Sequence, residues 1–143
     1  MQKEGELVDR TRTRIRFSEV DALGIVWHGN FVKYLEDGRE SFGEKYGLGY
    51  LDVYGKGWSM PVVKLEMDYK VQLKYGQEII IETRFVEVEA AKLVFEYTIY
   101  RKDDMAVVLT ARSIQVFVNL KGELELTNPE FFVKWKAVHD LKA

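Results

Sequence analysis

The chain has 143 residues, 47% of them apolar and 31% charged, with a formal net charge of −2. The length and composition predict one globular domain over residues 1–143. The net charge gives no reason to expect nucleic acid as a partner. The absence of cysteine excludes disulfides, thiol nucleophiles and Cys-ligated metal centres. No signal segment opens the chain and no apolar run approaches the ~20 residues that cross a bilayer, so we expect a cytoplasmic protein without membrane insertion.

Residues 7–17 alternate in character and predict a β-strand. Leu7, Asp9, Thr11, Thr13, Ile15 and Phe17 share one face, and the other face carries Val8, Arg10, Arg12, Arg14 and Arg16. The row of four arginines could contact an anionic ligand or a partner chain. We favour the simpler interpretation, a solvent-exposed strand face.

A long helix is predicted after Asn30, where the apolar period lengthens to three or four residues. The apolar stripe consists of Phe31, Tyr34, Leu35, Gly38, Phe42 and Tyr46. Asn30 is a reasonable N-cap and Gly47 a plausible left-handed stop. Glycine costs about 1 kcal/mol in a helix interior relative to alanine, so Gly38 on the buried stripe indicates close approach to another backbone, here a sheet.

The rest of the chain predicts four strands and a short C-terminal helix. The strand patterns cover residues 63–73, 78–88, 92–101 and 105–119. The later connections have hairpin length, which implies an antiparallel meander. Asn128 as N-cap and Pro129 at the first helical position open the terminal helix. The layout is α+β, with one long central helix wrapped by a strongly curved five-stranded antiparallel sheet. Long exposed strand edges predict a dimer with a continuous sheet.

The segment between the first strand and the helix, residues 18–30, is where chemistry is concentrated. Helix-start N–H groups lack intrahelical partners and carry partial positive charge, so they can stabilise an oxyanion. Asp21, about seven residues earlier, could approach the same carbonyl carbon and attack it or activate water. On their own, Asp21 would more often be a turn residue and His28 a capping or packing residue.

Residues 17–31 resemble the signature of hotdog-fold thioesterases of the 4-hydroxybenzoyl-CoA thioesterase type. That signature is an aspartate, two variable residues, Gly-Ile/Val-Val, an aromatic residue, often His or Tyr, then Asn and an aromatic residue. Residues 34–39, Tyr-Leu-Glu-Asp-Gly-Arg, resemble a helix segment of the same family. The resemblance implies a hotdog fold and hydrolysis of acyl-CoA or acyl-carrier-protein thioesters to free acid and thiol. It implies no metal or redox cofactor, since coenzyme A is part of the substrate.

The resemblance also assigns roles around the loop. It implies that Asp21 is the catalytic carboxylate, by covalent attack or by activating water. The backbone N–H of His28 would polarise the thioester oxygen, and its side chain would line the site. Gly24 and Asn30 would shape the loop, and Trp27 would pack beside the acyl or pantetheine channel.

Two further positions follow from the resemblance with less support. Ser59 matches a small polar position near the substrate in relatives, although an ordinary strand-start serine is an equal interpretation. Lys92 is the single basic residue in a turn, residues 87–92, where some relatives carry a basic cluster for the nucleotide phosphates. This departure leaves CoA recognition through other basic residues, or an acyl carrier protein as substrate, as alternatives.

Other interpretations of the same residues remain open. In a second clade of hotdog thioesterases the acid follows a His-Gly-Gly motif by nine residues, which here would be Asp37. Asn30 stands in place of the second glycine, so we favour Asp21. Glu36 and Arg39 could form a structural pair near a dimer interface. The expected assembly is a homodimer, paired further into a tetramer. A non-catalytic acyl-CoA-binding module and a hotdog hydratase are the alternative functions.

Overall fold

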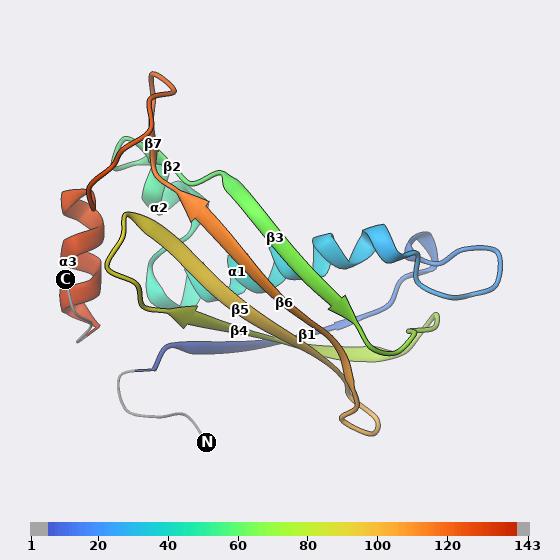
Figure 1. Ribbon diagram of the computed structural model, residues 1–143. Coiled ribbons are helices and arrows are strands. Elements are labelled where there is room, and N and C mark those ends of the chain that lie inside the picture. Colours follow the sequence, from blue (N-terminus) through green and yellow to red (C-terminus); the bar gives the residue numbers. More distant parts are fainter. Residues whose placement is uncertain (1–5, 140–143) are drawn as a thin grey trace.

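A five-stranded antiparallel sheet wraps around one long helix (Figure 1). This computed structural model describes residues 6–139. In sheet order the strands are β1 (Val8–Arg14), β4 (Glu78–Val86), β5 (Lys92–Arg101), β6 (Val107–Val116) and β3 (Val62–Tyr69). Helix α1 (Phe31–Tyr46) lies against the sheet, and α3 (Glu130–Val138) packs at one end of it. The predicted long helix, five-stranded sheet and short C-terminal helix are confirmed.

The meander predicted from the two later connections is confirmed, but β3 does not continue it. β4, β5 and β6 follow one another as hairpins, but β3 pairs with β6 and not with β4. The connection after β3 therefore crosses the molecule, and β1 and β3 form the two edges of the sheet. No helix within residues 6–139 is long and apolar enough to cross a membrane.

Several small elements escaped prediction, because each is too short to show a period. They are the 3-10 turns η1 (Phe17–Glu19) and η2 (His28–Asn30), helix α2 (Tyr50–Tyr54), and the paired strands β2 (Trp58–Ser59) and β7 (Val118–Asn119). The strand predicted over 7–17 ends at Arg14, and η1 follows. The strand predicted over 105–119 is divided at Phe117, which is fully buried.

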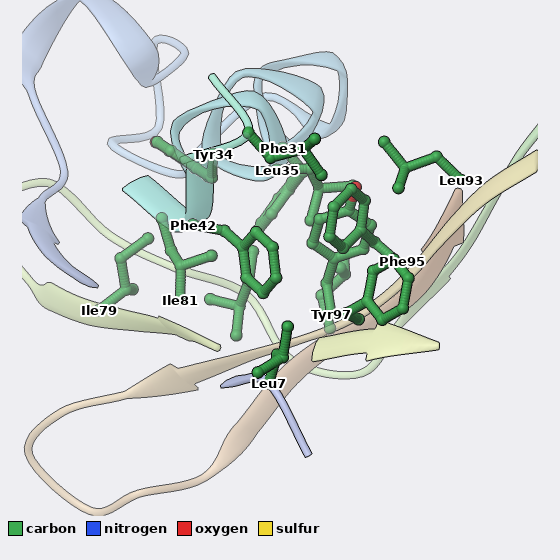
Figure 2. Close-up of a cluster of buried hydrophobic side chains, with 14 of the residues drawn as sticks. Leu7, Phe31, Tyr34, Leu35, Phe42, Ile79, Ile81, Leu93, Phe95 and Tyr97 are labelled. Carbon is green, nitrogen blue, oxygen red and sulfur yellow. The ribbon is translucent and has the colours of Figure 1, made fainter. Parts of the chain in front are cut away.

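The core lies between α1 and the sheet (Figure 2). Leu35 and Phe42 on the helix and Ile79 and Ile81 on β4 are completely buried. Gly38 faces the same layer. A Cβ atom at this position would lie 2.5 Å from Thr83 Oγ1 and 2.8 Å from Ile81 Cγ2. The predicted close approach to the sheet is thus confirmed, although the nearest atoms belong to β4 side chains and not to its backbone.

The helix ends support one prediction and correct two. Gly47 ends α1 with φ +74°, the left-handed conformation expected of it. Asn30 does not cap α1, because its backbone is helical and its side chain turns back to the preceding loop. At α3, Pro129 occupies the cap position and Asn128 Nδ2 donates to the Glu89 carbonyl instead.

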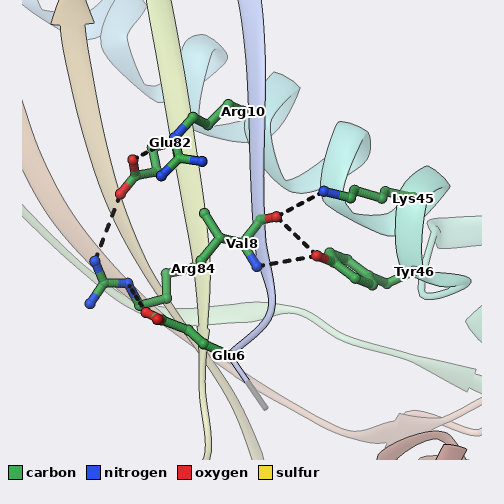
Figure 3. Close-up of polar contacts among 7 residues, drawn as sticks. All are labelled: Glu6, Val8, Arg10, Lys45, Tyr46, Glu82 and Arg84. Atoms are coloured by element: carbon green, nitrogen blue, oxygen red, sulfur yellow. Dashed lines mark hydrogen bonds and ion pairs between the residues drawn. The ribbon is translucent and has the colours of Figure 1, made fainter. Parts of the chain in front are cut away.

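The arginine face of β1 is exposed, as the simpler interpretation predicted. Arg10 pairs with Glu82 on the neighbouring strand at 2.9 Å, and Arg12 and Arg14 pair with Glu78. Glu82 is held from its other side by Arg84, as Figure 3 shows. These arginines therefore find their counter-charges within the sheet.

Candidate active site

A tight hairpin of residues 20–26, here called the Asp21 hairpin, projects beyond the start of α1 (Figure 1). The Asp21 amide donates to the Ile25 carbonyl at 2.8 Å. Asp21 Oδ1 accepts from the amides of Leu23 (2.8 Å) and Ile25 (3.3 Å). Gly24 supplies the positive φ of +75° that the turn requires. The Asp21 carboxylate is exposed, and its Oδ2 accepts no hydrogen bond from residues 6–139.

The start of the helix lies next to this hairpin. Turn η2 leads directly into α1, and the His28 amide stands at its beginning. That amide donates to no acceptor within the part of the chain that the structure describes. The His28 carbonyl, in contrast, accepts a hydrogen bond from the Tyr69 hydroxyl at 3.1 Å. The amide is therefore available to bind an oxygen at the positive end of the helix.

Asp21, Trp27 and His28 line one open groove of about 430 Å³. Its other walls are Leu23, Ile25, Val26, Phe31, Tyr69, Lys70, Val71 and Gln72. The Trp27 and His28 rings contact each other with centroids 5.1 Å apart. The groove thus combines a carboxylate, an unoccupied helix-start amide and apolar walls, which is what acyl transfer requires.

The other predicted site residues lie outside this groove. Ser59 lines a separate cavity of about 280 Å³ between α1, α2 and β5. Asn30 Nδ2 donates to the Glu19 carbonyl at 2.8 Å and acts on the loop backbone. Lys92 is exposed at the start of β5 and lines neither cavity. Gly24 shapes the Asp21 hairpin without lining the groove.

Asp37, the competing acid, is exposed on α1 and lines neither cavity. Loss of solvation raises the pKa of the Asp37 carboxyl, against the opposing effect of the Arg16 and Lys33 charges. Glu36 and Arg39 both line the Ser59 cavity. They form no ion pair within residues 6–139, and Arg39 instead donates to the Tyr97 hydroxyl at 3.2 Å.

Two residues around the site were not singled out from the sequence. Tyr69 ends β3 and contacts η2, and its strand alternation gave no sign of this contact. Glu19 is buried, with 4% exposure, and bonds to the loop and to α1. The sequence gives little sign of this role, because the bonds that link Glu19 with Asn30, Lys33 and Tyr34 join residues that are 11 to 15 positions apart.

The thioesterase-like superfamily model matches residues 15–136. The chain belongs to that superfamily. The Bacillus subtilis (strain 168) protein named "Putative acyl-CoA thioesterase YneP" is 33% identical over 93 residues, covering 65% of this chain and 67% of that protein. The Arabidopsis thaliana chloroplast acyl-acyl carrier protein thioesterase ATL3 is 25% identical over 108 residues, covering 76% of this chain and 57% of that protein.

The solved structures include 4-hydroxybenzoyl CoA thioesterase from Pseudomonas sp. strain CBS-3. It is 25% identical and superimposes with a TM-score of 0.78, covering 90% of this chain and 98% of that one. Together with superfamily membership, these similarities confirm the hotdog fold and the thioesterase class predicted from the sequence.

Proposed function

We propose that the protein hydrolyses acyl-CoA thioesters to a free carboxylic acid and a thiol, with the groove beside α1 as its active site. The observation that carries this proposal is that Asp21 and His28 line the same groove, and that the His28 amide donates to no acceptor within residues 6–139. The named thioesterases among the relatives support the reaction class.

The thioester carbonyl oxygen would accept the His28 N–H, which stabilises the oxyanion as the carbonyl carbon becomes tetrahedral. One such donor contributes about 3–4 kcal/mol to lowering a barrier. Asp21 Oδ1 is already held by backbone amides, so Oδ2 would act on the carbonyl carbon or on a water molecule. Either route breaks the C–S bond, releases the thiol and leaves the acid after water has added.

The proposal includes a homodimer joined through β3, with two dimers pairing into a tetramer. β3 is an edge strand, and six of its eight residues are exposed. The groove lies at its end, at Tyr69–Gln72, and the Ser59 cavity just before its start. Antiparallel pairing of two β3 strands would set the Ser59 cavity of one copy beside the groove of the other. This arrangement accounts for the separation of Ser59 from Asp21 within one chain.

Thiol release from a panel of acyl-CoAs tests the reaction. Wild type should release thiol, and Asp21→Asn should lose about 10²–10⁴-fold in kcat, because the amide keeps the turn-forming oxygen but not the reactive carboxylate. Asp37→Asn is the matched control and should keep its activity. Binding without release by wild type would leave a non-catalytic acyl-CoA-binding module, and loss of activity only in Asp37→Asn would assign the reaction to the other acid.

The carrier of the acyl group needs its own comparison, since a CoA thioester and an acyl carrier protein share the phosphopantetheine arm but only CoA carries the nucleotide. Acyl-CoA, acyl-pantetheine and acyl-carrier protein with the same acyl chain should be compared on wild type and Lys92→Ala. A role for Lys92 in binding the nucleotide phosphates of CoA predicts that Lys92→Ala raises the KM for acyl-CoA alone. An equal change for acyl-pantetheine would exclude that role.

Light scattering after size-exclusion chromatography tests the assembly. Val63 is 59% exposed on β3, and a lysine there should weaken strand pairing. Val107→Lys, on β6, is the control and should leave the mass unchanged. A monomeric wild type with full activity would rule out the proposed dimer site.

A further inference from the structure

Glu19 joins the Asp21 hairpin to the helix start at the backbone level. The Glu19 carbonyl accepts the Trp27 amide at 3.2 Å and Asn30 Nδ2 at 2.8 Å. These two bonds close the base of the hairpin, because Glu19 and Trp27 directly flank it. The hairpin is thereby fixed against turn η2.

The Glu19 side chain extends the same connection to α1. Its Oε1 accepts the Arg16 amide at 2.8 Å and the Tyr34 hydroxyl at 3.0 Å, and its Oε2 accepts Lys33 Nζ at 3.1 Å. Burial acts to raise the pKa of the Glu19 carboxyl, but hydrogen bonds from Arg16, Lys33 and Tyr34 outweigh it and keep the pKa below its ordinary value. A single carboxylate thus bonds to the segment before the hairpin and to the first turn of the helix.

We propose that Glu19 is a positioning residue, which fixes the Asp21 carboxylate relative to the His28 amide. This inference rests on the proposed thioesterase function. Glu19 does not line the groove and acts only through those two groups. A misplacement of 1 Å between reacting groups can cost about 10²-fold in rate. Loss of Glu19 should therefore lower kcat and leave ground-state binding, and with it KM, nearly unchanged.

Glu19→Gln removes the charge and keeps the size. One amide oxygen can still accept the Arg16 and Tyr34 bonds, but the amide NH₂ then faces the Lys33 ammonium, donor against donor. The bond to Lys33 on the helix is thereby lost, while the bond to Tyr34 can remain. Lys33 is half exposed, with 53% side-chain exposure, so its ammonium can turn to solvent and the chain should still fold.

Glu82→Gln is a matched control. Glu82 is also a buried carboxylate, at 8% exposure, with two cationic partners, Arg10 and Arg84 (Figure 3). It lies on β4 and lines neither the groove nor the Ser59 cavity. A general loss of stability from neutralising a buried carboxylate should affect both variants, whereas a positioning effect should affect only Glu19→Gln.

The kinetic test compares kcat and KM of both variants with one good substrate. Glu19→Gln should lower kcat about 10- to 100-fold with KM within about twofold, while Glu82→Gln changes neither by more than about twofold. Tyr34→Phe should give a smaller fall in kcat. Added to Glu19→Gln it should lower kcat further, because Glu19→Gln loses the Lys33 bond but keeps the Tyr34 bond. Equal kcat losses in Glu19→Gln and Glu82→Gln would overturn the inference.

A second readout does not depend on turnover. Amide hydrogen exchange of residues 20–28 should be faster in Glu19→Gln than in wild type, and unchanged in Glu82→Gln. Unchanged exchange in Glu19→Gln would refute the connection itself. Faster exchange with an unaltered kcat would refute only the positioning role, and an inactive wild type would refute the proposed function instead.

Discussion

The Tyr69 hydroxyl donates a hydrogen bond to the His28 carbonyl at 3.1 Å, which ties the last residue of β3 to the start of α1. The Tyr69 ring meets the Phe31 ring edge-on at 5.4 Å. An edge strand and the amino end of the helix are therefore held together by one side chain. This contact holds η2, and with it the His28 amide, in addition to the bonds to Glu19.

Tyr69→Phe keeps the ring and removes only the hydroxyl. A single hydrogen bond contributes about 0.5–1.5 kcal/mol to stability, so we expect a loss of this size in urea unfolding. We also expect a fall in kcat of about two- to fivefold as the helix start loosens. Tyr100→Phe, at a half-buried tyrosine on β5, is the control. Unaltered unfolding of Tyr69→Phe would show that water replaces the bond without cost.

Gly29→Ala should displace the Trp27 indole. A Cβ atom at Gly29 would collide with that ring. Because Trp27 is 55% exposed, the ring can swing outward, and the unfolding free energy should change by less than about 1 kcal/mol. KM should rise, since the groove loses an apolar wall. In a Trp27→Ala background the same substitution should have no effect on KM, and a persistent effect there would point to the backbone.

Gly38→Ala should destabilise the fold. The new methyl group would press on Thr83 and Ile81, and overpacking of this kind costs about 1–3 kcal/mol, more than the ~1 kcal/mol that alanine gains in a helix. Urea unfolding measures the difference. Glu44→Ala, on the exposed face of α1, should stay within about 0.5 kcal/mol of wild type. A more stable Gly38→Ala would mean that the helix can move away from the sheet at little cost.

The lowered pKa of Glu19 predicts a specific acid sensitivity. The unfolded chain takes up this proton at a higher pH than the folded chain, so the contribution is complete above the ordinary glutamate range and is lost as pH falls toward the lowered pKa. The unfolding free energies of wild type and Glu19→Gln should differ at about pH 7 and should converge as the pH falls below the ordinary glutamate range.

Glu78 is a second carboxylate with a lowered pKa, and its contribution to acid sensitivity must be distinguished from that of Glu19. Hydrogen bonds from Lys102, Arg14 and Arg12 hold the pKa of its carboxyl at about 2. Its contribution is the same in wild type and in Glu19→Gln, so it cancels in their difference. A gap between the two variants that is constant with pH would contradict the assignment to Glu19.

The long elements were predictable because their local patterns agree with their tertiary surroundings. The stripe from Phe31 to Tyr46 is buried as its period requires, and Gly47 ends the helix by its own backbone conformation. Asp21 and His28 were found through the family pattern of the loop. Their presence in one groove follows from Gly24 and the helix start, which adjoin them in sequence.

The features that could not be predicted from the sequence depend on contacts between segments that are distant along the chain. Short connections indicate hairpins, but nothing local reveals that β3 skips β4 and pairs with β6. The role of Glu19 depends on Lys33 and Tyr34, one helical turn into α1. Asn30 looked like a cap because asparagine favours that position, yet the Glu19 carbonyl is a better partner once the loop has folded.

The turn within the Asp21 hairpin has one further consequence. Because Leu23 and Ile25 hold Asp21 Oδ1, the carboxylate has lost its rotamer freedom before any ligand arrives. The side-chain entropy is lost when the chain folds, so ligand binding does not have to order this side chain again. A ligand atom can therefore replace solvent at the exposed Oδ2 without any movement of the Asp21 side chain.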